Sequence, residues 1–138
     1  MNPMVIDSSV TVKWVNQINE QHLDQADKIL IDAQAGSIIL LAPELTKYEI
    51  GNALIKKNLE LSLANEAFAM IYQLPITFIP ESEELAKQTF KIAKQVGVTY
   101  YDASFMALAQ QEDATLVTDN PKHQGKPSGI KVIALSDY

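Results

Sequence analysis

Short apolar runs recur along the chain and alternate with longer segments in which apolar residues are spaced as in a helix. A few consecutive apolar residues between turn-forming residues predict a buried strand, because such a run is too short for a helix. Apolar residues three or four positions apart predict instead a helix with one buried face. The short runs predict strands at Met4–Ile6, Ile38–Leu41, Ile76–Ile79, Thr115–Thr118 and Lys131–Leu135.

The segments between these runs predict helices, and several helix ends carry residues that favour such ends. Asp7, Ser62 and Ser82 have side chains that cap helix N-termini, Pro43 suits a first helical turn, and Gly97 suits a helix end. Strands that alternate with helices indicate an α/β fold with a mainly parallel sheet of four or five strands. The expected helices cover residues 10–15, 23–36, 44–58, 62–74, 82–97 and 101–111.

Composition narrows the classes of protein to be considered. The chain has 138 residues, of which 47% are apolar and 20% charged, which is ordinary globular usage and suits a single domain over residues 1–138. The absence of cysteine excludes disulfides, thiolate metal sites and cysteine nucleophiles, and fits a reducing cytoplasm. No segment approaches the roughly 20 apolar residues that cross a bilayer, so we expect a soluble, cytoplasmic protein with no membrane partner.

The charge balance limits how the protein could bind nucleic acid. The formal net charge is −6, and all eleven cations are lysines, so non-specific binding by phosphate neutralisation is disfavoured. A protein of this kind that acts on RNA must rely on metal ions and local lysines. Candidates for phosphate contacts are Lys56, Lys57, Lys122, Lys126 and Lys131. Tyr100 and Tyr101 are candidates for stacking on bases, although core or interface packing is the better interpretation for at least one of them.

Three acidic residues stand where predicted strands or loops give way to turns or helices. Asp7 and Asp119 each follow a strand, and Asp102 begins a helix. Because the carboxyl ends of parallel strands face one crevice, these side chains could meet there. Each also has a purely structural interpretation: Asp7 and Asp102 as helix caps, and the Asp119–Pro121 segment as an Asx turn.

Glu49 is harder to explain structurally, because it lies in the middle of a predicted helix. Leu45, Glu49, Asn52 and Ala53 fall on one face of that helix, so the carboxylate lies beside apolar neighbours and needs a cation or a donor. The competing interpretation is a surface glutamate that pairs with Lys56 or Lys57.

A gathering of carboxylates suits a hard cation. Mg²⁺ prefers oxygen ligands and retains several waters, so one or two direct carboxylates are sufficient. Bound metal activates water and stabilises charge on a phosphate, and no histidine is required; His22 and His123 lie in polar contexts that favour solvated rings. The sequence has no phosphate-binding loop, dinucleotide motif, zinc-binding His-Glu-x-x-His or serine elbow, so those mechanisms are excluded.

Four blocks of the sequence resemble PIN domains of the VapC type. They are the opening Met-Val-Ile-Asp-Ser-Ser-Val-Thr-Val-Lys-Trp, the Pro-Glu-Leu-x-x-x-Glu-Ile-x-Asn-Ala-Leu block at 43–54, the Gly-Val-Thr-Tyr-Tyr-Asp-Ala-Ser-Phe-Met-Ala-Leu-Ala block at 97–109, and Leu-Val-Thr-Asp at 116–119. Their order and spacing agree over essentially the whole chain. The resemblance implies a three-layer α/β/α fold and the toxin of a type II toxin–antitoxin pair: a Mg²⁺-dependent endoribonuclease in which Mn²⁺ can substitute, forming a homodimer and silenced by a cognate antitoxin.

The same resemblance assigns roles to particular residues. Asp7, Glu49, Asp102 and Asp119 would form the acidic catalytic site, with Asp7 and Asp102 as direct metal ligands. One departure affects the fourth position, because related sequences usually read Thr-x-Asp where this chain has Thr118-Asp119-Asn120. Asn120 then takes the usual place of the acid, which would weaken or remove a second metal ion. Supporting roles fall to Ser9, Asn52, Thr118 and Asn120.

Two further hypotheses follow from the same residues. The altered fourth position is compatible with a catalytically weakened PIN-like module that serves protein interaction. A receiver-like α/β domain also binds Mg²⁺ with acids, but it should carry two adjacent acids after its first strand, whereas Asp7 lies between Ile6 and Ser8. Mn²⁺ binding tests the first alternative, and formation of an acid-labile phosphoprotein tests the second.

Overall fold

The computed structural model describes residues 2–121 and 129–138 and is built around a parallel sheet. Its five strands lie in the order β3-β2-β1-β4-β5, and every neighbouring pair is parallel. The predicted α/β fold with a mainly parallel sheet is therefore confirmed. The strands are β1 (Asn2–Ile6), β2 (Ile38–Pro43), β3 (Ile76–Ile79), β4 (Thr115–Thr118) and β5 (Val132–Ala134).

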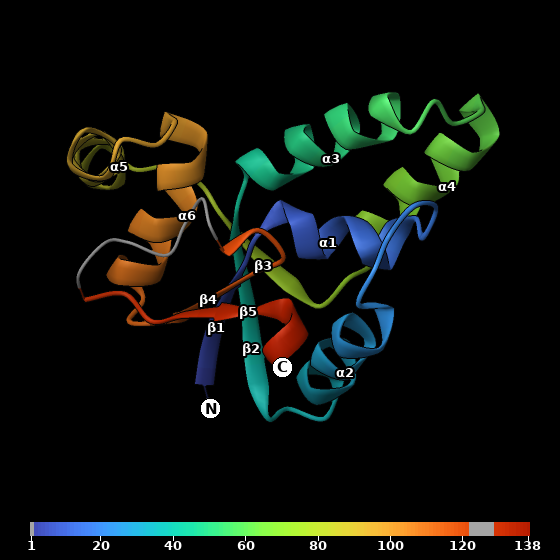
Figure 1. Ribbon diagram of the computed structural model, residues 1–138, viewed down its shortest axis with the longest axis horizontal. Helices are drawn as coiled ribbons and strands as arrows, with labels where there is room; N and C mark the ends of the chain where they lie inside the picture. The colour runs from blue at the N-terminus through green and yellow to red at the C-terminus, as the bar shows by residue number, and fades with distance from the viewer. Residues whose placement is uncertain (1, 122–128) are drawn as a thin grey trace.

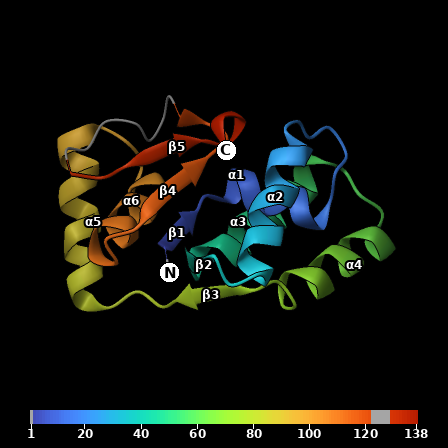
Figure 2. The ribbon, with the colours of Figure 1, turned by 90° about the horizontal axis from the view of Figure 1, so that it is seen from below.

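Helices lie on both faces of this sheet and give it three layers. α5 and α6 lie on one side, α1 and α2 lie on the other, and α3 and α4 extend away from the sheet as an antiparallel pair (Figures 1 and 2). None of the helices in the described segments has the length and apolar character needed to span a membrane. The helices are α1 (Ser8–Val15), α2 (Leu23–Gln34), α3 (Leu45–Lys56), α4 (Leu61–Ile71), α5 (Glu83–Val96) and α6 (Tyr100–Gln111), followed near the C-terminus by the short 3₁₀ helix η1 (Leu135–Asp137).

Alternation along the central strands produces the two faces. Because successive strand residues point to opposite sides, Val5 and Leu116 pack with α5 and α6, whereas Ile6 and Val117 pack with α1 and α2. These four side chains are fully buried.

The connections place a crevice between β1 and β4. The chain moves outward from β1 through β2 to β3 and then returns to β4 on the other side of β1. This change of direction is a topological switch point, where loops at the carboxyl ends of the strands separate and leave room for a ligand. Asp7 follows β1 and Asp119 follows β4, so both stand at this crevice.

Two predicted helix starts were wrong. Pro43 ends β2 instead of opening α3, because the following backbone N–H of Glu44 continues the strand pairing by donating to the Ile79 carbonyl at 3.1 Å. Ser62 lies inside the first turn of α4, and the N-cap is Glu60. In both places the sequence offered a good local signal for a cap or a first turn, and at Pro43 the pairing of β2 with β3 overrides it.

Candidate active site

A cleft of about 620 Å³ lies at the carboxyl end of the sheet. Segments that are distant in sequence form its walls: the start of α1, the middle of α3, the first turn of α6 and the residue after Asp119. Three of the four predicted acids, Asp7, Glu49 and Asp102, line it. The remaining lining residues are Ser8, Ser9, Val12, Leu45, Tyr48, Asn52, Ala53, Lys56, Tyr101 and Asn120.

Asp7 is both the cap of α1 and a wall of the cleft. Its Oδ2 accepts hydrogen bonds from the Ser9 backbone N–H at 3.2 Å, from Ser9 Oγ at 2.5 Å and from Thr118 Oγ1 at 3.2 Å. Asp7 is 8% exposed, and its own N–H donates to the Val117 carbonyl at 2.9 Å. The capping and the site interpretations of Asp7 are thus compatible, because the cap holds the carboxylate at the crevice.

Glu49 is partly buried against its acidic neighbours. Burial raises the pKa of the Glu49 carboxyl, the nearby charges of Asp7 and Asp102 raise it further, and the hydrogen bond from Ser8 acts in the opposite direction. Ser8 Oγ donates to Glu49 Oε1 at 2.7 Å. In the described part of the chain no lysine forms an ion pair with Glu49. The cleft therefore carries a concentration of negative charge that a cation would offset.

Asp102 lies in the first turn of α6 but does not cap it. The cap is Thr99, whose Oγ1 accepts a hydrogen bond from the Asp102 backbone N–H at 3.1 Å. A carboxylate in a first turn is favoured by the partial positive charge of the helix N-terminus. The structural interpretation of Asp102 as a cap is therefore wrong, and its side chain lines the cleft instead.

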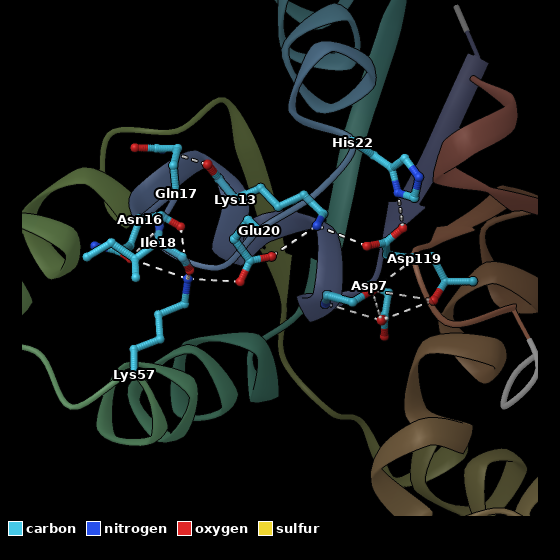
Figure 3. Close-up of polar contacts among 11 residues, drawn as sticks. Asp7, Lys13, Asn16, Gln17, Ile18, Glu20, His22, Lys57 and Asp119 are labelled. Carbon is cyan, nitrogen blue, oxygen red and sulfur yellow. Dashed lines mark hydrogen bonds and ion pairs between the residues drawn. The ribbon is translucent and has the colours of Figure 1, made fainter.

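The side chains of Asp119 and Asn120 have different surroundings, although the two residues are adjacent in the chain. The Asp119 carboxylate does not line the cleft; it lies 2.9 Å from Lys13 Nζ and 2.9 Å from His22 Nδ1 (Figure 3). Asn120 lines the cleft in its place, and its N–H donates to Thr118 Oγ1 at 3.0 Å. Three predicted acids and two amides, Asn52 and Asn120, therefore line the cleft, while Thr118 is fully buried beneath it.

The donors at this cleft suit a hard cation that keeps part of its water shell. Among residues 2–121 and 129–138, no three acidic, histidine or cysteine side chains converge closely enough to hold a metal ion directly. The donors are all oxygens, and Mg²⁺ often binds through one or two carboxylates and retained waters. Burial raises the pKa of Glu49, and the charges of Asp7 and Asp102 add to that shift. The residues present thus fit a magnesium ion bound partly through water.

The lysines and tyrosines proposed as RNA contacts have different surroundings. Lys56 and Tyr101 line the cleft. Lys57 does not fit that role, because its side chain is 9% exposed and pairs with Glu20 at 2.8 Å. Tyr100 donates to Glu81 at 2.7 Å, and burial together with that contact raises its pKa to about 12. Lys131 is exposed but does not line the cleft, and Lys122, His123 and Lys126 lie outside the described residues.

The ion pairs that surround Asp119 were not predicted from the sequence. His22 was expected to be a solvated ring, but it contacts Asp119. Lys13 was given no role, although its side chain is 2% exposed and bridges Asp119 and Glu20. A lysine between Val12 and Trp14 in a short helix of mostly buried residues was the available signal, since a buried lysine needs a carboxylate partner.

Comparison with known proteins agrees with this architecture. The PIN domain family matches residues 4–126. Ribonuclease VapC3 of Pyrobaculum aerophilum is 30% identical over an alignment of 120 residues that covers 83% of this chain and 87% of that protein.

Solved structures show the same fold at lower sequence identity. VapBC2 from Rickettsia felis, bound to a DNA fragment from its promoter, has a TM-score of 0.71 at 18% identity and covers 96% of this chain and 98% of that one. VapC20 of Mycobacterium tuberculosis, a sarcin-ricin loop cleaving toxin, has a TM-score of 0.64 at 12% identity and covers 81% of this chain and 85% of that one. The receiver-like alternative has no support in these matches, and the chain belongs to the PIN domain family.

Proposed function

We propose that this protein is a divalent-metal-dependent endoribonuclease of the VapC type. The observation that carries the proposal is the meeting of Asp7, Glu49 and Asp102, from three distant segments, around one cleft at the switch point of a PIN fold. The similarity to a protein named Ribonuclease VapC3 supports it. The shared fold with VapC20, a toxin that cleaves the sarcin-ricin loop, supports RNA as the substrate class.

Each residue at the cleft has a distinct part in the proposed reaction. Asp7 and Asp102 would hold Mg²⁺ or Mn²⁺, which supplies stabilisation of phosphate charge and lowers the pKa of a water when bound. Glu49 is suited to accept a proton from the attacking water, because a carboxylate with a raised pKa is a better base. Asn120 offers an amide that donates a hydrogen bond to a phosphate oxygen without adding charge.

Incubation of the purified protein with single-stranded and structured RNAs tests this proposal. Fragments should form with Mg²⁺ or Mn²⁺ and should disappear when EDTA is added. Cleavage that continues in EDTA would contradict a metal-dependent mechanism. Ribonuclease VapC3 of Pyrobaculum aerophilum, assayed in the same buffer, is the positive control.

Lys56 should contribute to RNA binding at this cleft. It lies one turn beyond Asn52 on the lining face of α3, so it can contact a phosphate next to the one that is cleaved. Lys56→Ala should raise KM about three- to tenfold and reduce the slope of log affinity against log salt by about 0.7, as expected for one lost contact with a single strand. Fluorescence anisotropy with a labelled RNA at several salt concentrations measures the slope.

The control is Lys91→Ala, which removes an exposed lysine of α5 and should change neither the KM nor the salt slope. Equal effects of the two substitutions would contradict the role of Lys56 in RNA binding.

A catalytically weakened interaction module is the second candidate, and Asn120 is the observation that favours it. An amide at this position lowers the negative charge available to a cation. Asn120→Asp should therefore raise Mn²⁺ affinity about tenfold or more, because a hard cation gains a charged ligand. Asn65→Asp adds the same charge on exposed α4 and is the control. Calorimetry that detects no Mn²⁺ binding in the natural protein would favour the interaction module over the nuclease.

We also propose a cognate antitoxin as the protein partner. The Rickettsia felis neighbour is a VapBC complex, and α3 and α4 of this chain present exposed apolar side chains, with Ile55 and Leu61 each 77% exposed. A groove of about 480 Å³ lies between these helices. Exposed apolar surface of this kind marks interaction sites. Co-purification with the product of a neighbouring reading frame tests the antitoxin, and light scattering tests the proposed homodimer.

A further inference from the structure

The Asp119 carboxylate belongs to an ion-pair network centred on the buried Lys13. Lys13 lies between Asp119 Oδ2, at 2.9 Å, and Glu20 Oε1, at 3.0 Å, and only 2% of its side chain is exposed (Figure 3). The second oxygen of Asp119 lies 2.9 Å from His22 Nδ1. Removing the charge of a buried lysine's partner is costly, so Lys13 strongly favours keeping Asp119 where it is.

The backbone of Asp119 is tied to the cleft from the other direction. Its N–H donates to Ser9 Oγ at 2.9 Å, and the same hydroxyl donates to Asp7 Oδ2 at 2.5 Å. Asp119 is therefore held at its N–H and at both carboxylate oxygens. Because Asn120 is the next residue and lines the cleft, any rotation of Asp119 would move both the hydroxyl that orients Asp7 and the amide of Asn120.

From this geometry we propose that Asp119 is a positioning residue and not a metal ligand. Lys13 and His22 hold its carboxylate outside the cleft, and through Ser9 it fixes the Asp7 carboxylate while presenting Asn120. The effect on metal binding rests on the proposed function, whereas the positioning itself does not. The charged ligands of the cleft would then be Asp7, Glu49 and Asp102, with a neutral amide at the fourth position.

The two possible roles of Asp119 predict opposite changes in metal affinity when Lys13 or His22 is replaced. If Asp119 were a ligand, Lys13 and His22 would compete with the cation for its oxygens, and removing either would tighten metal binding. If Asp119 positions Asp7 and Asn120, removing either weakens metal binding, because the site loses its order. Whether metal affinity rises or falls therefore distinguishes the two roles, and no activity assay is needed.

Calorimetric titration of Mn²⁺ into the metal-free protein provides this measurement. His22→Ala is the milder variant, since the His22 side chain is 37% exposed, and Lys13→Met is the stronger one. We expect about three- to tenfold weaker Mn²⁺ binding in both, with unchanged stoichiometry.

Glu20→Gln is the matched control: it weakens the pairs of Lys13 and Lys57 with Glu20 but leaves both contacts of Asp119 in place. Its Mn²⁺ affinity should stay within about twofold of the natural protein even where its melting temperature falls. Tighter binding in His22→Ala or Lys13→Met would overturn the proposal, as would an equal loss in Glu20→Gln.

Amide hydrogen exchange in the absence of metal tests the positioning separately. The Asp119 and Asn120 N–H groups donate to Ser9 and Thr118, so both should exchange at least severalfold faster in His22→Ala, while amides in the centre of the sheet stay unchanged. Unchanged exchange at these two amides would overturn the positioning role. A different outcome is that the natural protein binds no Mn²⁺ while His22→Ala still exchanges these two amides faster. That result would contradict the proposed function and support the positioning role.

Discussion

Replacing Asp7 and Asp102 together by asparagine should abolish RNA cleavage. The two carboxylates are the proposed direct ligands of the metal, and both line the cleft. A bound ion contributes several kcal/mol of stabilisation to the transition state, and each 1.4 kcal/mol corresponds to about a factor of ten in rate. We therefore expect cleavage to fall by about 10³-fold or more. Single-turnover assays with a labelled RNA at saturating Mg²⁺ measure this loss.

The double variant should remain folded, which makes the result interpretable. Asparagine is about as good an N-cap as aspartate, so Asp7→Asn keeps an acceptor for the Ser9 N–H, and Asp102 does not cap α6. A circular dichroism spectrum and melting temperature close to those of the natural protein provide the control. Retention of full cleavage by the folded double variant would exclude this cleft as the active site.

Glu49→Gln should lower cleavage about 100-fold, which is a typical contribution of a general base. Glutamine retains an oxygen that can accept the hydrogen bond from Ser8, so the geometry is preserved and the ability to accept a proton is lost. The rate against pH should also lose the limb that reports ionisation of Glu49. An unchanged rate and pH profile would show that another group accepts the proton.

The same substitution should slightly stabilise the metal-free protein near neutral pH. Burial and the charges of Asp7 and Asp102 raise the pKa of Glu49 above its ordinary value of 4.5. A raised carboxyl pKa means that the fold is favoured while the group is protonated, and this contribution is lost as the pH rises through the raised pKa. Glu49→Gln should therefore increase the melting temperature by about 1–2 °C near neutral pH, as for other partly exposed substitutions.

Thermal melts across a pH series measure this difference. The gain should shrink as the pH falls towards 4.5 and vanish well below it, where Glu49 is protonated in both states. Added Mn²⁺ should reverse the order by stabilising the natural protein more than the variant. A variant that is less stable than the natural protein near neutral pH without metal would contradict the raised pKa of Glu49.

Much of the fold was predictable because its signals are local. The strands at 76–79 and 115–118 match the prediction, since short apolar runs determine them. The helix that begins after Ser82 and ends at Gly97 also matches, because a serine hydroxyl that accepts from Leu85 and a glycine at φ 79° act within one turn. Pro43 and Ser62 misled the prediction, because neither residue alone reveals where a neighbouring strand or loop takes over.

The site was predictable only in part for a similar reason. Asp7 and Asp102 stand at boundaries between elements, and Glu49 stands on a partly apolar helix face, so their positions in the sequence indicate the cleft. The separation of Asp119 from Asn120 depends on Lys13 and His22, which lie about a hundred residues earlier in the chain. No local pattern indicates which of two adjacent polar side chains will turn inward. That choice follows from the tertiary ion pairs.

Anomalous diffraction from crystals soaked in Mn²⁺ tests most directly whether these carboxylates hold a cation. We expect a peak in the cleft at about 2.1 Å from carboxylate oxygens of Asp7 and Asp102, a distance typical of such octahedral sites, with the Asp119 carboxylate still paired to Lys13. A cleft without a peak at saturating Mn²⁺, or a peak centred on Asp119, would contradict the assignment of the site.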